Sequence, residues 1–236
     1  MRICVVHPSV TKESANRLAK AIGAYTWNPY QGYPPGVAID VWFNYGYGGS
    51  CPSVKYATRG KERINPPASV RVSTDKIKTY EAFVKAGVPT CEYVTNQKDI
   101  PKKWKWIVCR ETVNGRNCEG VTITQQENIV KDCPLYTKFF DHDEEHRIVV
   151  FKGQIVARYM KTNLKDGEYE LTHMLEDGYA DIDKTAIQAC LAVGLDYAGV
   201  DVLYSNRTGK HIALEINSGP LLTAEAEEFF INHFKG

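Results

Sequence analysis

The segment GVDVLYSNRTGKHIALEINSGPLL, residues 199–222, constrains the fold of this chain more than any other segment. Two apolar stretches flank a polar turn over residues 205–210, and this pattern predicts a β-hairpin. Side chains on a strand alternate between faces, so Glu215 and Asn217 share one face. The hairpin can bring Asp201 to that face, because it lies on the partner strand. We therefore expect three polar side chains to meet on one side of two apolar strands.

The predicted hairpin offers two carboxylates and an amide, a set of ligands that suits a hard cation. Asp201, Glu215 and Asn217 would supply oxygen ligands from a rigid support. Mg²⁺ takes such ligands when substrate phosphates complete its coordination. A carboxylate within an apolar strand also needs a partner, because burying an unpaired charge is costly. A plainer interpretation stays open, since acidic residues on strands often face solvent and Asn-Ser-Gly-Pro is a turn signal.

Composition narrows the classes of protein to which the chain can belong. It has 236 residues, enough for one large domain or two to three small lobes, and its net charge is +1. This neutral balance disfavours a nucleic-acid partner and a membrane partner. The seven cysteines include no CxxC pair, which argues against a disulfide framework and a zinc site. No window is apolar enough for a membrane span, and scattered cysteines fit a cytoplasmic protein.

The first 70 residues predict a small α/β lobe. Strands are expected at Ile3–Val6 and Val37–Asn44, with a helix over Ser14–Ile22 that ends at Gly23. Residues 25–36 are rich in Pro, Gly and aromatic residues and predict a loop. The glycines that follow lack GxGxxG spacing, so a substrate-side loop or a simple turn is favoured over a dinucleotide-binding loop.

The rest of the chain predicts an α+β arrangement with antiparallel hairpins. Ser73 is expected to cap a helix over Lys76–Ala86 that ends at Gly87. Lys152-Gly153, between two apolar stretches, is a hairpin signal. The expected strands are 107–110, 120–124, 135–140, 147–151 and 154–160, and the expected later helices are 182–193, ending at Gly194, and 225–234.

Three segments in this order resemble the ATP-grasp superfamily. They are DKIKTYEAFVKAGVPT, EHRIVVFKGQIV and the Asp…Glu-x-Asn hairpin, and the resemblance runs from about Val72 to Leu222. It is closest to compact members similar to amino-acid ligases, of the kind met in phage genomes. The resemblance implies an ATP-grasp fold with a short N-terminal α/β lobe, residues 1–70. Two α+β subdomains, residues 71–140 and 141–236, would follow and enclose a nucleotide site.

The resemblance implies ATP as cofactor, with one or two Mg²⁺ ions on the hairpin ligands and Mn²⁺ as an alternative ion. ATP carries about four negative charges, and the resemblance assigns Lys76 and Arg110 to its phosphates. The family usually has Lys at the second position, where Arg keeps the charge and changes the geometry. Residues 114–119, NGRNCE, would form the lid over the phosphates, with a plain hairpin turn as the alternative.

The resemblance also implies an adenine site at the end of the strand that carries TKFF. Backbone groups of Thr137, Lys138, Phe139 and Phe140 would bind the adenine edge. Lys138 would lie near the purine, and one of the two phenylalanines would cover its face. Asp143 is assigned to the ribose hydroxyls. Aromatic residues at these positions are also ordinary core residues, so this alternative stays open.

The resemblance assigns catalytic roles to residues of the β-hairpin that follows and to a residue of the strand that carries the metal ligands. The resemblance implies that Arg147 neutralises a phosphate or the substrate carboxylate and that Glu145 orients it. Lys161 would face the γ-phosphate, and Asn217 would act beside the metal. His173 lies where the family often has Asn or Arg near the acyl phosphate. The alternatives are a surface ion pair for the first two residues, which would be worth little, and a structural histidine.

The activity implied by the resemblance is an ATP-dependent carboxylate–amine ligase that works through an acyl phosphate. Neither step needs a protein nucleophile, because positioning and charge neutralisation carry the catalysis. The substrates would be a small molecule, amino acid or peptide with a carboxylate, and an amine acceptor. Two alternatives stay open: a small-molecule kinase and a nucleotide-binding or inactive scaffold. Homodimers are common in such folds, and the sequence does not decide the oligomeric state.

Overall fold

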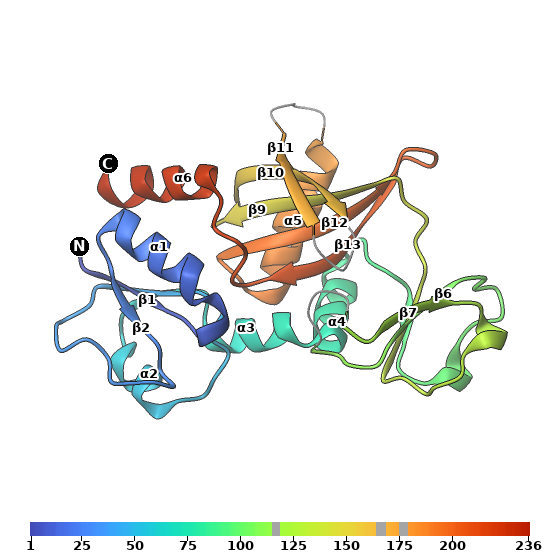
Figure 1. The fold of residues 1–236 in the computed structure, drawn as a ribbon, viewed down its shortest axis with the longest axis horizontal. Coiled ribbons are helices and arrows are strands. Elements are labelled where there is room, and N and C mark those ends of the chain that lie inside the picture. Colours follow the sequence, from blue (N-terminus) through green and yellow to red (C-terminus); the bar gives the residue numbers. More distant parts are fainter. Residues whose placement is uncertain (115–118, 164–168, 175–178) are drawn as a thin grey trace.

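The structure of the chain is a computed structural model that describes residues 1–114, 119–163, 169–174 and 179–236 (Figure 1). It contains one parallel and two antiparallel sheets joined and covered by helices. This mixture confirms the predicted α+β class. The predicted lid over residues 114–119 falls mostly outside the described residues.

The first lobe is built on a parallel sheet with the order β2-β1-β3-β4. Its helix α1 ends at Gly23, whose φ of 69° satisfies the left-handed conformation that glycine adopts freely. The expected loop at residues 25–36 is wrong at its start, because residues 25–27 form β2 and pair with β1. The elements of this lobe are β1 (Ile3–Val6), a 3₁₀ turn (Ser9–Thr11), α1 (Lys12–Ile22), β2 (Tyr25–Trp27), β3 (Val41–Asn44), α2 (Pro52–Ala57) and β4 (Glu62–Ile64).

Two consecutive helices, α3 (Pro67–Thr74) and α4 (Lys76–Ala86), connect the first lobe to the rest of the molecule. The predicted cap Ser73 is wrong, because it lies inside α3 and its hydroxyl donates to the Val70 carbonyl. Asp75 caps α4 instead and accepts hydrogen bonds from the N–H groups of Ile77 and Lys78. The cap fixes the start of α4, where Lys76 is the first helical residue.

The Asp75→Ala variant is expected to lose about 1 kcal/mol of stability, because the first turn of α4 would lose its capping oxygen. Urea unfolding would measure the change as a lower midpoint with an unchanged slope. Glu81→Ala, at an exposed position of the same helix, is the control and should change stability by less than about 0.5 kcal/mol. Equal stability of the two variants would show that the cap does not stabilise α4.

The second sheet is antiparallel with the order β5-β8-β6-β7. The pairing of β6 with β8 places Arg110 and Thr137 on one face of this sheet and Cys109 and Lys138 on the other. Opposed residues share a face, so Arg110 and Lys138 point to opposite sides of the sheet. The elements are β5 (Tyr93–Val94), a 3₁₀ turn (Gln97–Asp99), β6 (Ile107–Arg110), β7 (Val121–Thr124), a 3₁₀ turn (Gln126–Asn128) and β8 (Leu135–Lys138).

The third sheet is antiparallel with the order β11-β10-β9-β12-β13. The predicted hairpin at Lys152-Gly153 is confirmed, and both residues have positive φ, 46° and 78°. In Figure 1, α5 lies behind the sheet and α6 runs beside it over the first lobe. The elements are β9 (Glu144–Phe151), β10 (Gln154–Asn163), β11 (Tyr169–His173), α5 (Ala180–Val193), β12 (Tyr197–Ser205), β13 (Lys210–Asn217) and α6 (Ala224–Lys235).

Alternation along β9 separates two hydrophobic cores. Ile148 and Val150 belong to the core that includes α4 and α5. Val149 and Phe151 belong to the core that includes the first lobe and α6. The odd-numbered residues of β9, Arg147 among them, therefore face the first lobe. This face is where the polar side chains of the candidate site gather.

The helices in the part of the chain that the structure describes are all too short or too polar to cross a lipid bilayer. Each of the three sheets is formed by a different part of the sequence. We propose that residues 1–70, 71–140 and 141–236 are the three domains.

Candidate functional site

A row of polar residues crosses the third sheet from edge to edge. The β-sheet register places Arg147 opposite Asp201 on one side and Tyr159 on the other. Directly opposed residues lie about 5 Å apart and share a face. The complete row, one residue per strand, is His173, Tyr159, Arg147, Asp201 and Glu215.

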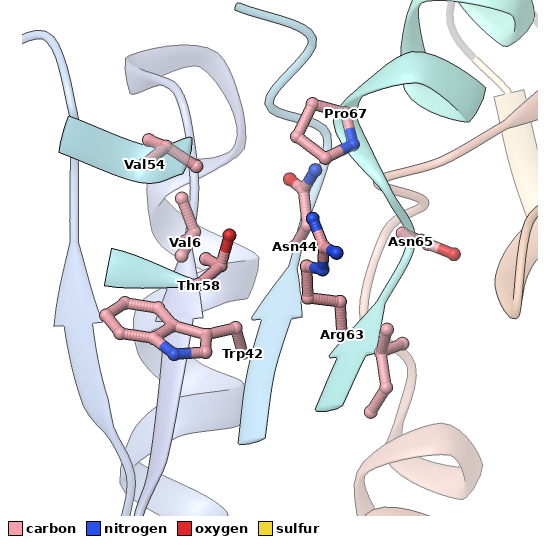
Figure 2. A pocket seen from close by; sticks show the side chains of 9 residues that line it. Val6, Trp42, Asn44, Val54, Thr58, Arg63, Asn65 and Pro67 are labelled. Carbon is pink, nitrogen blue, oxygen red and sulfur yellow. The ribbon is translucent and has the colours of Figure 1, made fainter. Parts of the chain in front are cut away.

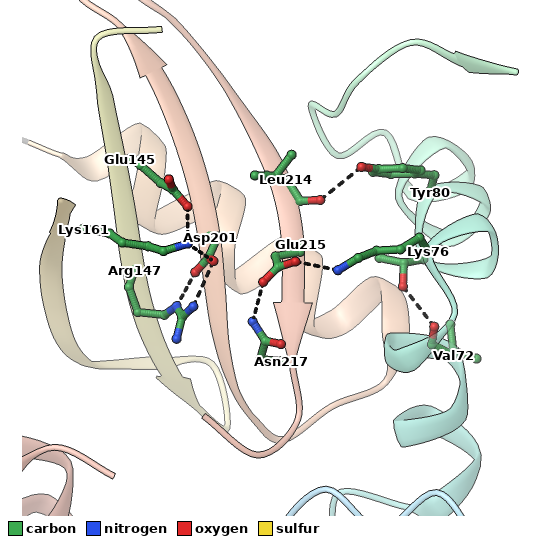
Figure 3. A network of polar contacts seen from close by, with 11 residues as sticks. Val72, Lys76, Tyr80, Glu145, Arg147, Lys161, Asp201, Leu214, Glu215 and Asn217 are labelled. Atoms are coloured by element: carbon green, nitrogen blue, oxygen red, sulfur yellow. Dashed lines mark hydrogen bonds and ion pairs between the residues drawn. The ribbon is translucent and has the colours of Figure 1, made fainter. Parts of the chain in front are cut away.

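Asp201 is fully buried in this row, between Arg147 and Glu215. The Arg147 guanidinium binds both its oxygens, through Nε to Oδ1 and through Nη2 to Oδ2 at 2.8 Å (Figure 3). Lys161 Nζ lies 3.2 Å from Oδ2. Burial alone would lower the pKa of Arg147, but the Asp201 carboxylate raises it above its ordinary value. The buried carboxylate therefore has two cationic partners.

Glu215 and Asn217 lie on β13, next to Asp201 on β12, as strand alternation predicts. Lys76 Nζ is 2.5 Å from Glu215 Oε2, and Asn217 Nδ2 donates to Oε1 at 3.0 Å. Burial would raise the pKa of Glu215, but the Lys76 ammonium, with Asn217 and Arg147, holds it well below its ordinary value. Because its NH₂ group faces Glu215, the Asn217 amide has its oxygen left to bind another group.

A β-bulge shapes β13 at this point. Asp201 pairs with Glu215 and the next residue of β12 pairs with Ala213, so Leu214 is the extra residue. Bulges are common beside active sites, where they redirect side chains. Leu214 packs with Phe140 against a small apolar cluster next to the acidic pair. An apolar surface therefore borders the charged residues.

Lys161 and Glu145 extend the network along β9 and β10. Lys161 Nζ is 2.5 Å from Glu145 Oε1, and both side chains are largely buried. The carboxylates of Asp201 and Glu145 raise the pKa of Lys161 although burial opposes this. Tyr169 on β11 places its ring 5.1 Å from Lys161 Nζ and 5.8 Å from Arg147 Cζ. The predicted catalytic residues Arg147 and Lys161 thus share a carboxylate and an aromatic neighbour.

Tyr169 is a residue that the sequence interpretation missed. A signal was present, because Tyr169, Leu171 and His173 alternate with polar residues, a pattern typical of a half-buried strand. The ring lies against two cations, which is a favourable arrangement for an aromatic face.

Arg110 lies on the inner face of the second sheet, and the ion pairs of the described residues give it no carboxylate partner. Its Nε is buried, and no acceptor among the described residues reaches it. Orphaned buried donors are rare in folded proteins and call for an explanation. An anionic group between the two antiparallel sheets would supply the missing acceptor.

Several predicted binding residues lie apart from the charged network. The Lys138 ammonium is 2.7 Å from Glu92 Oε1, on the opposite face of the sheet from Arg110. The Asp143 carboxylate accepts from the Asn206 N–H at 2.7 Å, at the turn between β12 and β13. The structure therefore does not bring the side chains of Lys138 and Asp143 to the site.

The predicted adenine hinge continues from β8. Thr137 is buried on the inner face, opposite Val108. The N–H of Phe139 donates to the Trp106 carbonyl, while the described hydrogen bonds include none from the N–H of Phe140. Phe139 lies near the His142 ring, with centroids 6.2 Å apart. Of the two phenylalanines, Phe140 is the one that packs in the same apolar cluster as Leu214, beside Asp201 and Glu215.

Gly199 makes room for Arg147. A Cβ at this position would lie 3.0 Å from Arg147 Cδ and 3.0 Å from Pro220 Cβ. Gly199→Ala is therefore expected to cost about 1 to 3 kcal/mol by overpacking and to displace Arg147 from Asp201. Thermal unfolding and nucleotide titration would measure both effects. Gly153→Ala is the control, because it shows whether a glycine replacement elsewhere also weakens nucleotide binding. Unchanged nucleotide binding in Gly199→Ala would contradict the prediction.

A small cavity in the first lobe is not a rival site. It lies between Trp42, Thr58 and Arg63 (Figure 2), and its volume is about 10 Å³. That volume holds one water molecule. The buried indole N–H of Trp42 has no partner among the described residues, and a single water would satisfy it. The cavity excludes any substrate.

The donor set fits a hard divalent cation that is shared with a substrate. Within the described residues, no three His, Cys, Asp or Glu side chains form a closed metal cage. Asp201 and Glu215 supply two carboxylates, and Asn217 supplies an amide oxygen. Mg²⁺ is usually bound in this way, by one or two carboxylates with phosphates and waters completing the shell. The cations around the set suit the phosphates.

Comparisons with known proteins agree with this geometry. The family described as RimK-like ATP-grasp domain matches residues 106–234. No curated protein sequence matches the chain. Among solved structures, the ATP-grasp ligase PsnB with minimal precursor, Mg and ADP has a TM-score of 0.70, 11% identity and coverage of 98% of this chain and 97% of that chain.

Two further solved structures cover nearly the whole chain. D-alanine–D-alanine ligase from Bacillus anthracis complexed with ATP has a TM-score of 0.67 and 14% identity, over 99% of this chain and 97% of that chain. The RimK domain ATP-grasp protein from Sphaerobacter thermophilus DSM 20745 has a TM-score of 0.66 and 13% identity, over all of both chains. The fold is the ATP-grasp fold, as the sequence resemblance predicts. Because the family match spans more than half of the residues, the chain belongs to the RimK-like ATP-grasp family.

Proposed function

We propose that the protein is an ATP-dependent carboxylate–amine ligase that forms an amide or peptide bond and releases ADP and phosphate. One observation carries the proposal. Asp201, Glu215 and Asn217 stand on one sheet face among Lys76, Arg147 and Lys161. Such a face can hold a metal ion and several phosphate oxygens at once.

The metal would be held by Asp201, Glu215 and Asn217. Bound there, one or two Mg²⁺ ions, or Mn²⁺, would neutralise charge on the phosphate oxygens. The chain's own residues are prepared for that charge. Three cations and three carboxylates, Glu145 included, balance one another in the described network. ATP with a metal ion would bring phosphates to the Lys and Arg side chains and a cation to the carboxylates, and it could therefore replace the partners that these side chains have in one another.

The cations would bind the phosphates of ATP. Lys76 and Lys161 would exchange carboxylate partners for phosphate oxygens, and Arg110 would gain the acceptor that its buried Nε lacks. Arg forks onto two oxygens, which suits a phosphate. Phe140 and Leu214 would contact the purine, with the Phe140 N–H available to its edge. The phosphates and the purine would thus each have a chemically matched neighbour.

The ligase reaction needs few special groups. A substrate carboxylate would attack the γ-phosphate to give an acyl phosphate and ADP, and an amine would then displace phosphate. The structural neighbours support this reaction type, because PsnB is an ATP-grasp ligase complexed with a precursor, Mg and ADP and the Bacillus anthracis protein is a D-alanine–D-alanine ligase. We propose an amino acid or peptide carboxylate and an amine acceptor as substrates.

Product analysis tests the proposal. The protein would be incubated with Mg²⁺, ATP, hydroxylamine as a general acceptor, and pools of amino acids and dipeptides as carboxylates. A ligase is expected to release ADP and phosphate in equal amounts and to form a hydroxamate. ADP without phosphate would identify a kinase instead. Nucleotide binding without ADP release in any pool would favour a binding module and contradict the proposal.

A further inference from the structure

A second polar cluster borders the nucleotide-facing network on the β10 and β11 side. The Tyr159 hydroxyl lies 2.5 Å from Glu225 Oε2 and 2.5 Å from Thr223 Oγ1. His173 Nδ1 is 3.7 Å from Glu225 Oε1, and its ring lies 5.4 Å from the Tyr159 ring. The proposed ATP chemistry uses none of these residues.

Glu225 differs from the other carboxylates on this face. Glu145, Asp201 and Glu215 each bind a Lys or Arg. The ion pairs of the described residues give Glu225 no Lys or Arg partner, only His173. The Tyr159 hydrogen bond, which is the largest influence, lowers the pKa of Glu225, so it is ionised at neutral pH. About a third of its side chain is exposed. A cation from solution can therefore reach this carboxylate.

The cluster lies next to the reacting end of the proposed site. Tyr159 is directly opposite Arg147 in the β9–β10 register. The segment after Asn217 leads to α6, whose first turn carries Glu225 against β10. This brings α6 beside the third sheet (Figure 1). Tyr159 therefore links the two residues, because it pairs with Arg147 in the sheet and its hydroxyl bonds Glu225.

We propose that Glu225 binds the ammonium group of the amine acceptor, with the rings of Tyr159 and His173 beside it. This proposal rests on the proposed ligase function and names a subsite within it. An acceptor amine is an ammonium ion in neutral solution, and the carboxylates of the neighbouring network are already paired with Lys or Arg. A carboxylate without a Lys or Arg partner supplies the attraction, and aromatic faces add to it.

The subsite also accounts for how Glu225 is held. The Tyr159 hydroxyl holds Glu225 Oε2, while Oε1 is turned toward the half-exposed His173. A carboxylate that served only the start of α6 would interact with the helix dipole and would not discriminate between ligands. Discrimination between an ammonium and a neutral ligand is therefore the property to measure.

A titration with matched small molecules tests the subsite directly. The ¹⁵N-labelled full chain would be titrated with L-alaninamide, which carries an ammonium, and with propionamide, which lacks it. We expect saturable shifts of the amide signals of residues 223–226 with L-alaninamide and at least tenfold weaker binding of propionamide. Glu225→Gln should remove this preference, and Glu228→Gln, at an exposed position of the same helix, should keep it.

Equal binding of the two ligands by the wild-type chain, or an ammonium preference that survives in Glu225→Gln, would overturn the proposal. The titration does not depend on turnover, so a failure of the ligase assay is read separately. With an active enzyme, Glu225→Gln should raise the KM for L-alaninamide at least tenfold and change turnover with neutral hydroxylamine by less than twofold. Equal loss with both acceptors would contradict the subsite.

Discussion

Glu215→Gln is expected to lower ATP-dependent turnover about a thousandfold, because a metal ion supplies several kcal/mol of charge stabilisation and each 1.36 kcal/mol is a factor of ten. The amide has the shape of the carboxylate but lacks its charge. It would weaken a cation ligand and also the contact with Lys76 Nζ, now 2.5 Å away. Both changes would weaken the binding of the ATP phosphates, which the metal ion and Lys76 are proposed to contact. ADP release under saturating ATP measures the effect.

The control for this variant is Glu228→Gln, which removes one negative charge at an exposed position. It should keep turnover within about a factor of two, because surface charges contribute little. Circular dichroism and thermal unfolding would show that Glu215→Gln is folded. A folded Glu215→Gln protein that retains more than a tenth of wild-type turnover would contradict the metal assignment.

Arg147→Met is expected to destabilise the protein by about 3 to 5 kcal/mol, because it leaves a buried carboxylate without its bidentate partner. Asp201 is 0% exposed, so water cannot replace the guanidinium. Lys161 remains at 3.2 Å and offsets part of the loss. For a chain of this size the change corresponds to about 6 to 20 °C in the unfolding temperature. Differential scanning calorimetry would measure it.

An exposed ion pair provides the matched control. Arg207 and Asp141 are 71% and 70% exposed, and Arg207→Met should change stability by less than about 1 kcal/mol. The double variant Arg147→Met, Asp201→Asn should recover part of the stability, since it leaves no unpaired buried charge. Equal effects of Arg147→Met and Arg207→Met would show that the buried pair has no special role.

Local signals predicted the regular elements well where they were strong. Gly23, Gly87 and Gly194 end helices with positive φ, as expected for C-terminal glycines. The Lys152-Gly153 hairpin is another case. The short elements were missed, because β2, β4 and β5 have two or three residues and depend on pairing with distant strands. Pairing of this kind leaves no periodic pattern in the sequence.

Helix caps show where local rules competed. Ser73 and Asp75 are both good capping residues, and the sequence interpretation chose the first. The structure uses Asp75, because Ser73 lies inside α3 and bonds to Val70. α3 itself was not expected, so its last turn was interpreted as the approach to α4. The error follows from a missed short helix.

Strand alternation accounts for much of the candidate site. It places Glu215 and Asn217 on one face, and the hairpin brings Asp201 beside them. The same rule separates Thr137 from Lys138, although the sequence interpretation gave both to the nucleotide. Applied to that strand, alternation would have turned Lys138 away. The roles assigned to these residues stay predictions.

Contacts between distant segments could not be predicted. The bulge at Leu214 lies within the β12–β13 hairpin but has no signal in the sequence, and the contact of the Tyr169 ring with Arg147 joins two strands, β11 and β9, that are not consecutive. Asp143 is a similar case, because the turn that contains Asn206 supplies its partner. Such contacts follow from tertiary packing, which overrides local preference.

The most direct test of the central claim is the thermal shift produced by Mg²⁺ with a non-hydrolysable ATP analogue, measured beside Glu215→Gln and Glu228→Gln. At about a hundredfold the dissociation constant, binding adds about 2.7 kcal/mol, or roughly 5 to 10 °C for this chain. We expect a Mg²⁺-dependent shift of this size in the wild type and in Glu228→Gln, and a much smaller one in Glu215→Gln. No shift in the wild type, or an equal shift in Glu215→Gln, would contradict the assignment of a metal–nucleotide site to this sheet face.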